Sequence, residues 1–180
     1  MRVLKVRGVG KVVHYADLVV VNFTVMSKDY TYDKAINELN YKTEILKQDI
    51  EKANFSRDEL KTINFYINPE YRFQNNENIF LGFKAIHELK LEFTFDKVVL
   101  NNLLKIISNS KSEATFNLSF EVKDKTLIKG EALRSAVKDA KNNANIIANS
   151  AEIKLGKILN IEYLNQFAPF RSTLRIDNPE

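Results

Sequence analysis

The sequence predicts an α+β fold in which one or more antiparallel sheets are covered by two long helices and one short helix. Two periodicities carry this prediction. Between residues 79 and 95, apolar and polar side chains alternate, which is typical of a strand with one buried face. Within residues 31–54 and 126–151, apolar residues recur at spacings of three and four, which is typical of amphipathic helices. Helices that cover one face of a sheet bury both kinds of one-sided element.

The first half of the chain is expected to form two strands, a long helix and a third strand. Thr31 or Asp33 can cap the start of the helix, and Asn54 can adopt the left-handed conformation that ends it. The expected elements are strand 3–13, turn 14–17, strand 17–26, helix 31–54 and strand 63–67.

A polar loop and a long, bent strand are expected in the middle of the chain. Pro69 is expected to stop the strand before it, and residues 70–78 are rich in turn-forming residues. The strand at 79–95 exceeds the usual length of about 3–10 residues. Gly82 therefore marks a bend or a bulge.

The second half repeats this order of elements, which suggests two strand–helix halves and an internal duplication. Asp96 is expected to cap the short helix, and alanines dominate the apolar face of the last helix. The expected elements are helix 96–107, strand 116–122, helix 126–151 and strand 158–164. We expect residues 1–166 to form a single domain, and the semi-apolar tail 167–180 to dock on the same chain or on a neighbour.

Composition and charge exclude several classes of protein. The 180 residues include no cysteine, which excludes disulfides and thiolate metal sites. The net charge of +4 arises from 27 basic and 23 acidic residues without a block of like charges. Nucleic-acid binding is disfavoured, because a phosphate-binding surface needs clustered positive charge.

Neither a membrane span nor a signal peptide is expected from the sequence. No segment approaches the roughly 20 apolar residues that a spanning helix needs. Charged residues interrupt the N-terminal segment every few positions, so it lacks the apolar region of a signal peptide. The sequence as it stands favours a cytoplasmic protein; the alternative is an exported or periplasmic protein whose signal peptide was trimmed.

No pattern in the chain points to catalysis. Gly8-Val9-Gly10 lacks the third glycine and the following helix of a dinucleotide-binding loop, so a backbone bend is the better interpretation. His14 and His87 lie in unrelated segments and are expected to be structural. We therefore assign no catalytic, cofactor-binding or metal-binding residue and expect that the protein is not an enzyme. The alternative, a ligand binder or enzyme with an unrecognised site, would need a pocket in which His14 or His87 approaches carboxylates or Arg72.

Three residues in the predicted loop are candidates for an interaction surface. Tyr71 and Phe73 flank Arg72, and aromatic and arginine side chains are typical anchors of protein contacts. The alternative is that the two aromatic side chains fold back onto their own sheet. The sequence leaves both interpretations open.

Several motifs, in order, resemble the SIMPL-domain family, also called the oxidative-stress-defence or periplasmic immunogenic protein family. They are the Gly8-Val9-Gly10 opening, residues 64–72 (NFYINPEYR), residues 81–85 (LGFKA), the alanine-rich residues 131–148, and residues 155–158 (LGKI). The similarity extends from about Val3 to Leu164. Ala16-Asp17 stands where members commonly have Pro-Asp, and the signal peptide of many bacterial members is absent from this sequence.

This resemblance implies a non-catalytic bacterial protein with a link to the cell envelope or to stress tolerance. Some relatives look like homo-oligomers that form rings or barrels, and the family transfers no catalytic residue to this chain. We therefore expect a homo-oligomeric scaffold or interaction protein, with an unidentified protein as a further possible partner. A long strand with an exposed edge would supply a self-complementary surface for such assembly.

Overall fold

The computed structural model of the chain describes residues 3–163. These residues form two compact units. Residues 17–121 make up the first, which we call the sheet unit, and residues 3–16 with 122–163 make up the second, which we call the helix unit. Within the described residues, no helix is both long enough and apolar enough to cross a membrane.

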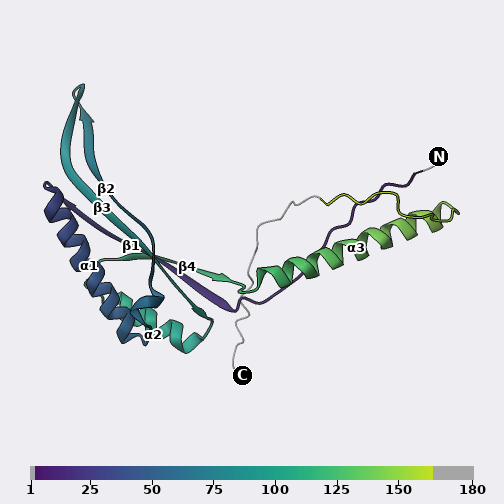
Figure 1. Ribbon diagram of the computed structural model, residues 1–180, viewed down its shortest axis with the longest axis horizontal. Helices are drawn as coiled ribbons and strands as arrows, with labels where there is room; N and C mark the ends of the chain where they lie inside the picture. Colours follow the sequence, from purple (N-terminus) through teal and green to yellow (C-terminus); the bar gives the residue numbers. More distant parts are fainter. Residues whose placement is uncertain (1–2, 164–180) are drawn as a thin grey trace. The chain divides into compact units, whose positions relative to one another are not determined.

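The sheet unit contains one four-stranded antiparallel sheet with the strand order β2-β3-β1-β4. Helices α1 and α2 lie against one face of this sheet (Figure 1). This arrangement confirms the predicted α+β class, whereas the internal duplication stays a prediction. The elements are β1 Leu18–Asp29, α1 Tyr32–Lys52, the 3-10 helix η1 Arg57–Glu59, β2 Lys61–Gln74, β3 Glu77–Thr94, α2 Lys97–Ser108 and β4 Thr115–Glu121.

The core of the sheet unit lies between the sheet and the two helices. β1 is the central contributor, because alternate residues on its helix-facing side are fully buried. Residues opposite one another across strands share a face, so the partners of β1 on β3 are buried with them. The buried side chains are Val19, Val21, Phe23 and Val25 of β1, Leu39, Leu46 and Ile50 of α1, Leu89 and Leu91 of β3, and Leu100, Leu103 and Ile107 of α2.

The helix ends follow the sequence signals in part. The Asp96 carboxylate accepts hydrogen bonds from the backbone N–H groups of Val98 and Val99, which confirms it as the cap of α2. Asn54 has a φ of 67°, as predicted for the residue that ends α1. Thr31 occupies the N-cap position without a side-chain cap. The Asp29 carboxylate accepts the N–H of Thr31 instead.

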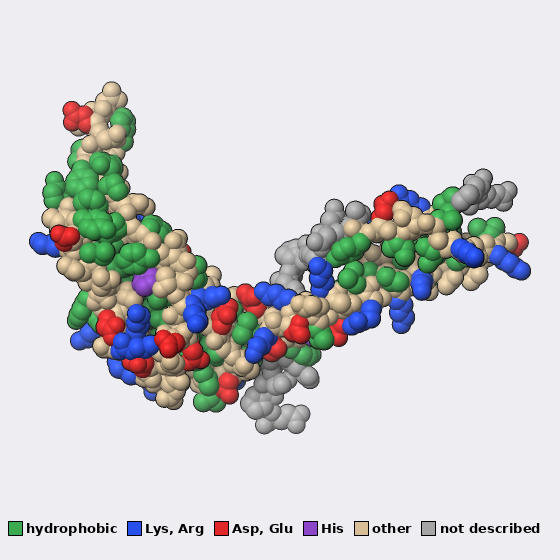
Figure 2. All heavy atoms as spheres, viewed as in Figure 1, with side chains coloured by type: hydrophobic (Ala, Val, Ile, Leu, Met, Phe, Trp, Pro, Cys, Tyr) green, Lys and Arg blue, Asp and Glu red, His purple; other side chains and the backbone are tan. Residues whose placement is uncertain are grey.

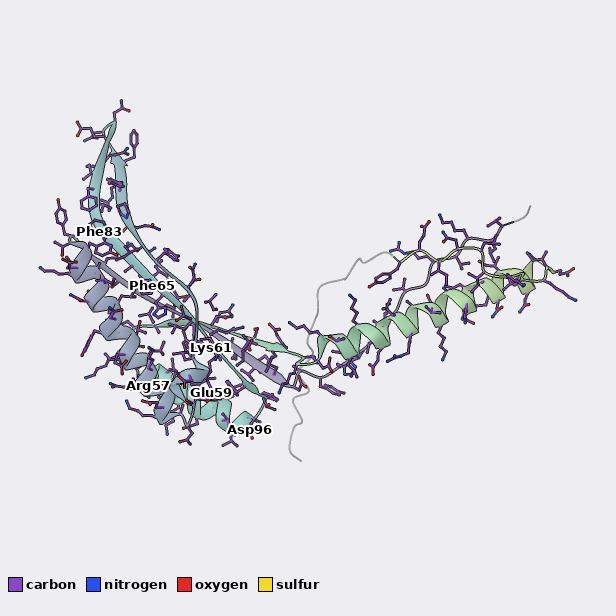
Figure 3. All side chains as sticks on the ribbon, viewed as in Figure 1. Arg57, Glu59, Lys61, Phe65, Phe83 and Asp96 are labelled. Atoms are coloured by element: carbon purple, nitrogen blue, oxygen red, sulfur yellow. The ribbon has the colours of Figure 1, made fainter. Side chains whose placement is uncertain are left out.

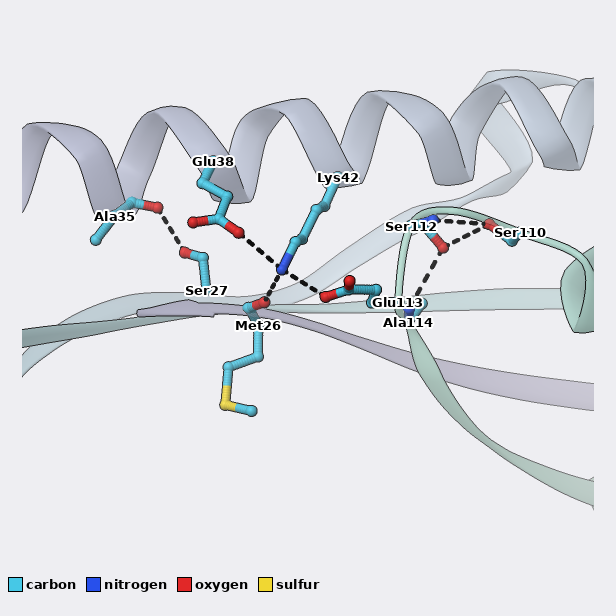
Figure 4. Close-up of polar contacts among 9 residues, drawn as sticks. All are labelled: Met26, Ser27, Ala35, Glu38, Lys42, Ser110, Ser112, Glu113 and Ala114. Carbon is cyan, nitrogen blue, oxygen red and sulfur yellow. Dashed lines mark hydrogen bonds and ion pairs between the residues drawn. The ribbon is translucent and has the colours of Figure 1, made fainter. Parts of the chain in front are cut away.

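A lysine of α1 connects this helix to β1 and to the loop between α2 and β4. The ammonium group of Lys42 lies 3.0 Å from Glu38, 2.8 Å from Glu113 and 3.4 Å from the carbonyl oxygen of Met26 (Figure 4). The hydrogen bond to Glu113 is the main cause of the raised pKa of Lys42. Its long aliphatic stem lets a charged residue on the helix surface reach these partners.

The predicted loop at 70–78 is wrong, because the region is a continuous hairpin. β2 runs through Pro69 to Gln74, and the turn consists of Asn75 and Asn76, with φ of 52° and 66°. Two consecutive positive φ angles are typical of the tight type I′ hairpin turn, which asparagine tolerates. Pro69 fits because β2 is an edge strand, where a residue without an N–H costs no sheet hydrogen bond on the open side.

The helix unit combines α3, Lys125–Ser150, with an extended N-terminal segment. The segment lies directly on the alanine face of the helix: a Cβ added at Gly8 would lie 2.0 Å from the carbonyl oxygen of Ala136, and one at Gly10 would lie 1.8 Å from that of Ala132. Neither glycine has a positive φ. No turn or bend occurs within residues 3–14, so the predicted backbone bend is wrong, and close approach of two backbones explains these glycines.

Two predicted strands in the helix unit do not form ladders. Residues 3–13 are extended and pair with no strand of the described part of the chain, and the predicted hairpin with β1 is wrong because β3 and β4 already occupy both sides of β1. Residues 158–163, the described part of the predicted last strand, also lie outside any sheet. The tail 167–180 is outside the described residues, and the boundary at residue 166 stays a prediction.

Candidate interaction surface

The end of the β2–β3 hairpin continues beyond the rest of the sheet. The ladder between β1 and β3 ends at the pair Asp29 and Phe83, so within residues 3–163 the stretch 77–82 of β3 pairs only with β2. This end of the hairpin therefore lacks a third strand, and it extends past the sheet in Figure 1. A two-stranded ribbon exposes more of both faces than a strand inside a sheet.

A bulge at Gly82 decides which side chains share a face of the hairpin. Glu70 lies opposite Gly82, but the next residue, Tyr71, lies opposite Phe80, so β3 contains one extra residue here. The extra residue shifts the alternation by one position. Phe80 and Phe83, three residues apart, consequently lie on the same face, which is the face that α1 covers further along the sheet.

Gly82 is the residue that the bulge requires. Its φ is +120°, and an added Cβ would lie 2.5 Å from the carbonyl oxygen of Asp29 at the end of β1. A residue with a side chain would be strained in this conformation and would also collide with the backbone. The bend or bulge predicted at Gly82 is confirmed.

Five aromatic side chains form a connected cluster on this face, and a sixth lies further along it. The ring of Phe80 lies 5.3 Å from Tyr30, 5.5 Å from Tyr71 and 5.4 Å from Phe83, measured between centroids. Phe83, labelled in Figure 3, lies near the start of α1, where its ring centroid is 5.7 Å from that of Tyr32. Phe73 lies on the same face, closer to the tip. We call these residues the aromatic hairpin surface: Tyr30, Tyr32, Tyr71, Phe73, Phe80 and Phe83.

Much of the aromatic hairpin surface is open to solvent. Tyr30 is 69% exposed, Tyr71 57% and Phe73 68%. Figure 2 shows hydrophobic side chains gathered along the hairpin, while charged side chains gather lower on the sheet unit. A contiguous exposed aromatic patch is typical of a binding surface, whereas scattered exposed apolar residues are common in any protein.

The structure separates the three predicted interaction residues. Tyr71 and Phe73 point to the aromatic face, whereas Arg72, between them, points to the opposite face opposite Ile79. The three residues thus do not form one cluster, although each lies on the hairpin. Tyr30, Tyr32, Phe80 and Phe83 were not predicted to belong to this surface. The available signal was the density of aromatic residues directly after β1 and in the first half of β3.

An ion pair holds the opposite face of the hairpin base. The ammonium group of Lys28, on β1, lies 2.7 Å from the Glu70 carboxylate on β2. This hydrogen bond lowers the pKa of Glu70 below its ordinary value. Because both side chains are substantially exposed, the pair positions the strands but adds little stability.

His87 has structural partners on both ring nitrogens. Its Nδ1 lies 3.2 Å from the hydroxyl of Thr43 on α1, and its Nε2 lies 2.9 Å from that of Thr62 on β2. The side chain is buried, and the ring of Phe65 packs against it edge to face at 5.2 Å. These contacts agree with the predicted structural role of His87.

We expect the protein to lose stability as the pH falls, because His87 is buried in its neutral form. Burial, followed by the positive charge of Lys47, lowers the pKa of His87 below 6.5. An unfolded chain takes up the proton near pH 6.5, so below that pH it binds more protons than the folded chain. The free energy of unfolding should therefore fall between about pH 7 and 5. Urea titrations of the wild type and His87→Gln measure this slope; equal slopes would contradict the assignment.

His14 has a separate set of contacts in the helix unit. Its Nε2 lies 2.7 Å from a carboxylate oxygen of Glu131 on α3. Further along the same helix, the Asp139 carboxylate accepts a hydrogen bond from the backbone N–H of Val9 at 2.9 Å. Among residues 3–163, no three His, Asp or Glu side chains come together closely enough to share a metal ion.

Comparisons with known proteins agree with the family-level resemblance. A family model named SIMPL and described as a protein of unknown function (DUF541) matches residues 4–177. No curated protein matches the chain. One matching solved structure is a de novo designed protein, Foldit4, which is 14% identical, with 58% of this chain and 99% of that chain covered and a TM-score of 0.25.

Proposed function

Since the chain belongs to the SIMPL family of proteins of unknown function, we propose that it is a non-catalytic scaffold or interaction protein that assembles with copies of itself. The aromatic hairpin surface is the observation that carries this proposal. Tyrosine and phenylalanine are enriched in the buried centres of protein interfaces, and their few rotatable bonds limit the entropy lost on binding. The proposed role in envelope or stress tolerance rests on the resemblance alone.

The hairpin suits assembly because its aromatic rings are already ordered by one another. Phe80 is in ring contact with Tyr30, Tyr71 and Phe83, so a partner meets a preformed surface. Preorganisation of this kind raises affinity because fewer side chains lose freedom on binding. A hairpin that extends past its sheet can also reach a second copy before the sheet units collide.

We expect the double substitution Tyr71→Ser and Phe73→Ser to shift the wild-type assembly toward smaller species. Both side chains are exposed, so the loss should fall mainly on association and leave the thermal midpoint within a few degrees. Multi-angle light scattering over a hundredfold range of protein concentration measures the change in mass.

Arg72→Ser is the matched control, because Arg72 lies on the same strand but on the opposite face. It should leave the assembly unchanged if the aromatic face makes the contact. A wild-type protein that stays monomeric at every concentration would contradict the proposal.

For the stress role, a deletion strain should lose oxidant tolerance and regain it with the wild-type gene but not with the double variant.

A further inference from the structure

β4 is an edge strand whose sequence is symmetric about its central residue. Among the described residues it has β1 on one side and no strand on the other. Its sequence, Thr-Phe-Asn-Leu-Ser-Phe-Glu, places phenylalanines two positions before and after Leu118 and small polar residues one position before and after it. When two copies of one strand pair antiparallel, the first half of the strand in one copy lies beside the second half in the other.

This symmetry matches the requirement of a twofold interface. In such an interface, if residue i contacts residue j of the second copy, then j contacts i. With the axis at Leu118, Phe116 lies opposite Phe120 of the partner subunit, and Asn117 lies opposite Ser119 of the partner subunit. Directly opposite side chains have Cβ atoms about 4.5–5.5 Å apart, so the aromatic pairs form twice.

The helix-facing side of β4 has an apolar surface that such a contact would cover. Phe116 pairs with Phe23 of β1 and therefore points toward α2, yet it remains 43% exposed. Beside it lie the apolar side chains of Leu104 and Ile107 of α2. A second phenylalanine next to Phe116 would shield this part of the core from water.

Charge and backbone donors favour β4 as the site of self-pairing over two alternatives, the edge strand β2 and the extended N-terminal segment. Residues 115–120 carry no charge, and the axis at Leu118 places Glu121 opposite Thr115 of the partner subunit. The other edge strand, β2, contains Pro69, which cannot donate to a new strand. The extended N-terminal segment carries three positive charges, at Lys5, Arg7 and Lys11, on one face, so pairing with its own copy would oppose like charges.

We propose that β4 pairs antiparallel with β4 of a second copy about a twofold axis at Leu118, which joins two four-stranded sheets into one continuous sheet. The inference rests on the proposed self-assembly and adds a contact separate from the aromatic hairpin surface. Two different self-contacts in one chain explain how dimers joined at β4 could be linked through their hairpins into larger assemblies.

Cysteine cross-linking tests the axis directly, because the chain contains no native cysteine. In Leu118→Cys, the two sulfur-bearing residues lie opposite each other, with Cα atoms about 4.5–5.5 Å apart, which is within the range of a disulfide. We expect mild oxidation to convert this variant largely to a covalent dimer on a non-reducing gel. Circular dichroism before and after reduction checks that the fold is retained.

Thr115→Cys is the matched control on the same strand. Three residues separate it from the axis, so the two copies of Cys would lie roughly 20 Å apart at about 3.3 Å per residue. It should not cross-link. Equal cross-linking of both variants, or no cross-linking of Leu118→Cys while the wild type is oligomeric, would overturn the β4 contact.

The hairpin double variant separates this inference from the proposed function. In the background of Tyr71→Ser and Phe73→Ser, Leu118→Cys should still cross-link, because the β4 contact does not involve the aromatic surface. Loss of the cross-link in that background would overturn the independence of the two contacts. A monomeric wild type would instead contradict self-assembly itself, whatever the cross-linking result.

Discussion

Phe23→Ala should lower the free energy of unfolding of the sheet unit by about 3–5 kcal/mol, the usual range for a buried phenylalanine. Phe23 is 1% exposed and lies at the middle of β1, where it pairs with Leu89 on one side and Phe116 on the other. Its removal leaves a cavity that the rigid sheet and two helices cannot fill. Because small domains are stable by only about 5–15 kcal/mol, this loss removes a large fraction of the free energy of unfolding.

Urea denaturation followed by far-ultraviolet circular dichroism measures this loss. Val98→Ala is the control, because it removes an apolar side chain from α2 that is largely exposed. It should change the free energy of unfolding by less than about 0.5 kcal/mol. Comparable losses in the two variants would mean that Phe23 is not at the centre of the core.

The sheet unit was predictable because burial on one face leaves a regular pattern in the sequence. The alternation around Leu89 and the three-four spacing around Leu46 both arise from side chains that the structure buries fully. Helix caps were equally predictable where a single side chain accepts hydrogen bonds from nearby N–H groups, as Asp96 does. These signals are local, so the sequence contains all that is needed to find them.

The β2–β3 hairpin was predicted wrongly because the residues that mark it occur in two kinds of structure. Pro69 and the pair Asn75-Asn76 are as typical of a loop as of an edge strand followed by a tight turn. Only the strand order, with β2 at the edge, decides between them. The aromatic hairpin surface depends further on the bulge opposite Glu70, which fixes the faces of Phe80 and Phe83, and no local pattern states which residue is extra.

The helix unit was the least predictable part, because its defining contacts join distant segments. Val9 and Asp139 are separated by 130 positions, and the glycines beside Val9 are explained only by the helix on which they lie. The sequence showed alanines on one face of α3 and two glycines near the N-terminus. Their contact with each other required the tertiary structure.

Gly10→Val should detach the N-terminal segment from α3. The new Cβ would lie 1.8 Å from the carbonyl oxygen of Ala132 and 2.8 Å from its carbonyl carbon. These are backbone atoms of a helix, which cannot swing away as the end of a flexible side chain can. Overpacking in a rigid contact costs about 1–3 kcal/mol or more, so separation of the segment is the expected response.

The hydrogen bond next to this glycine provides the measurement. The N–H of Val9 donates to Asp139 only while the segment lies on the helix, so its hydrogen exchange should accelerate strongly in Gly10→Val. Gly156→Val is the matched control, because no heavy atom lies within 4 Å of a Cβ at that position. Unchanged protection of the Val9 amide would show that the helix can yield to a side chain. If the Val9 amide exchanges faster while the sheet unit keeps its urea midpoint, the contact between the two glycines and the alanine face of α3 is not needed for the stability of the sheet unit.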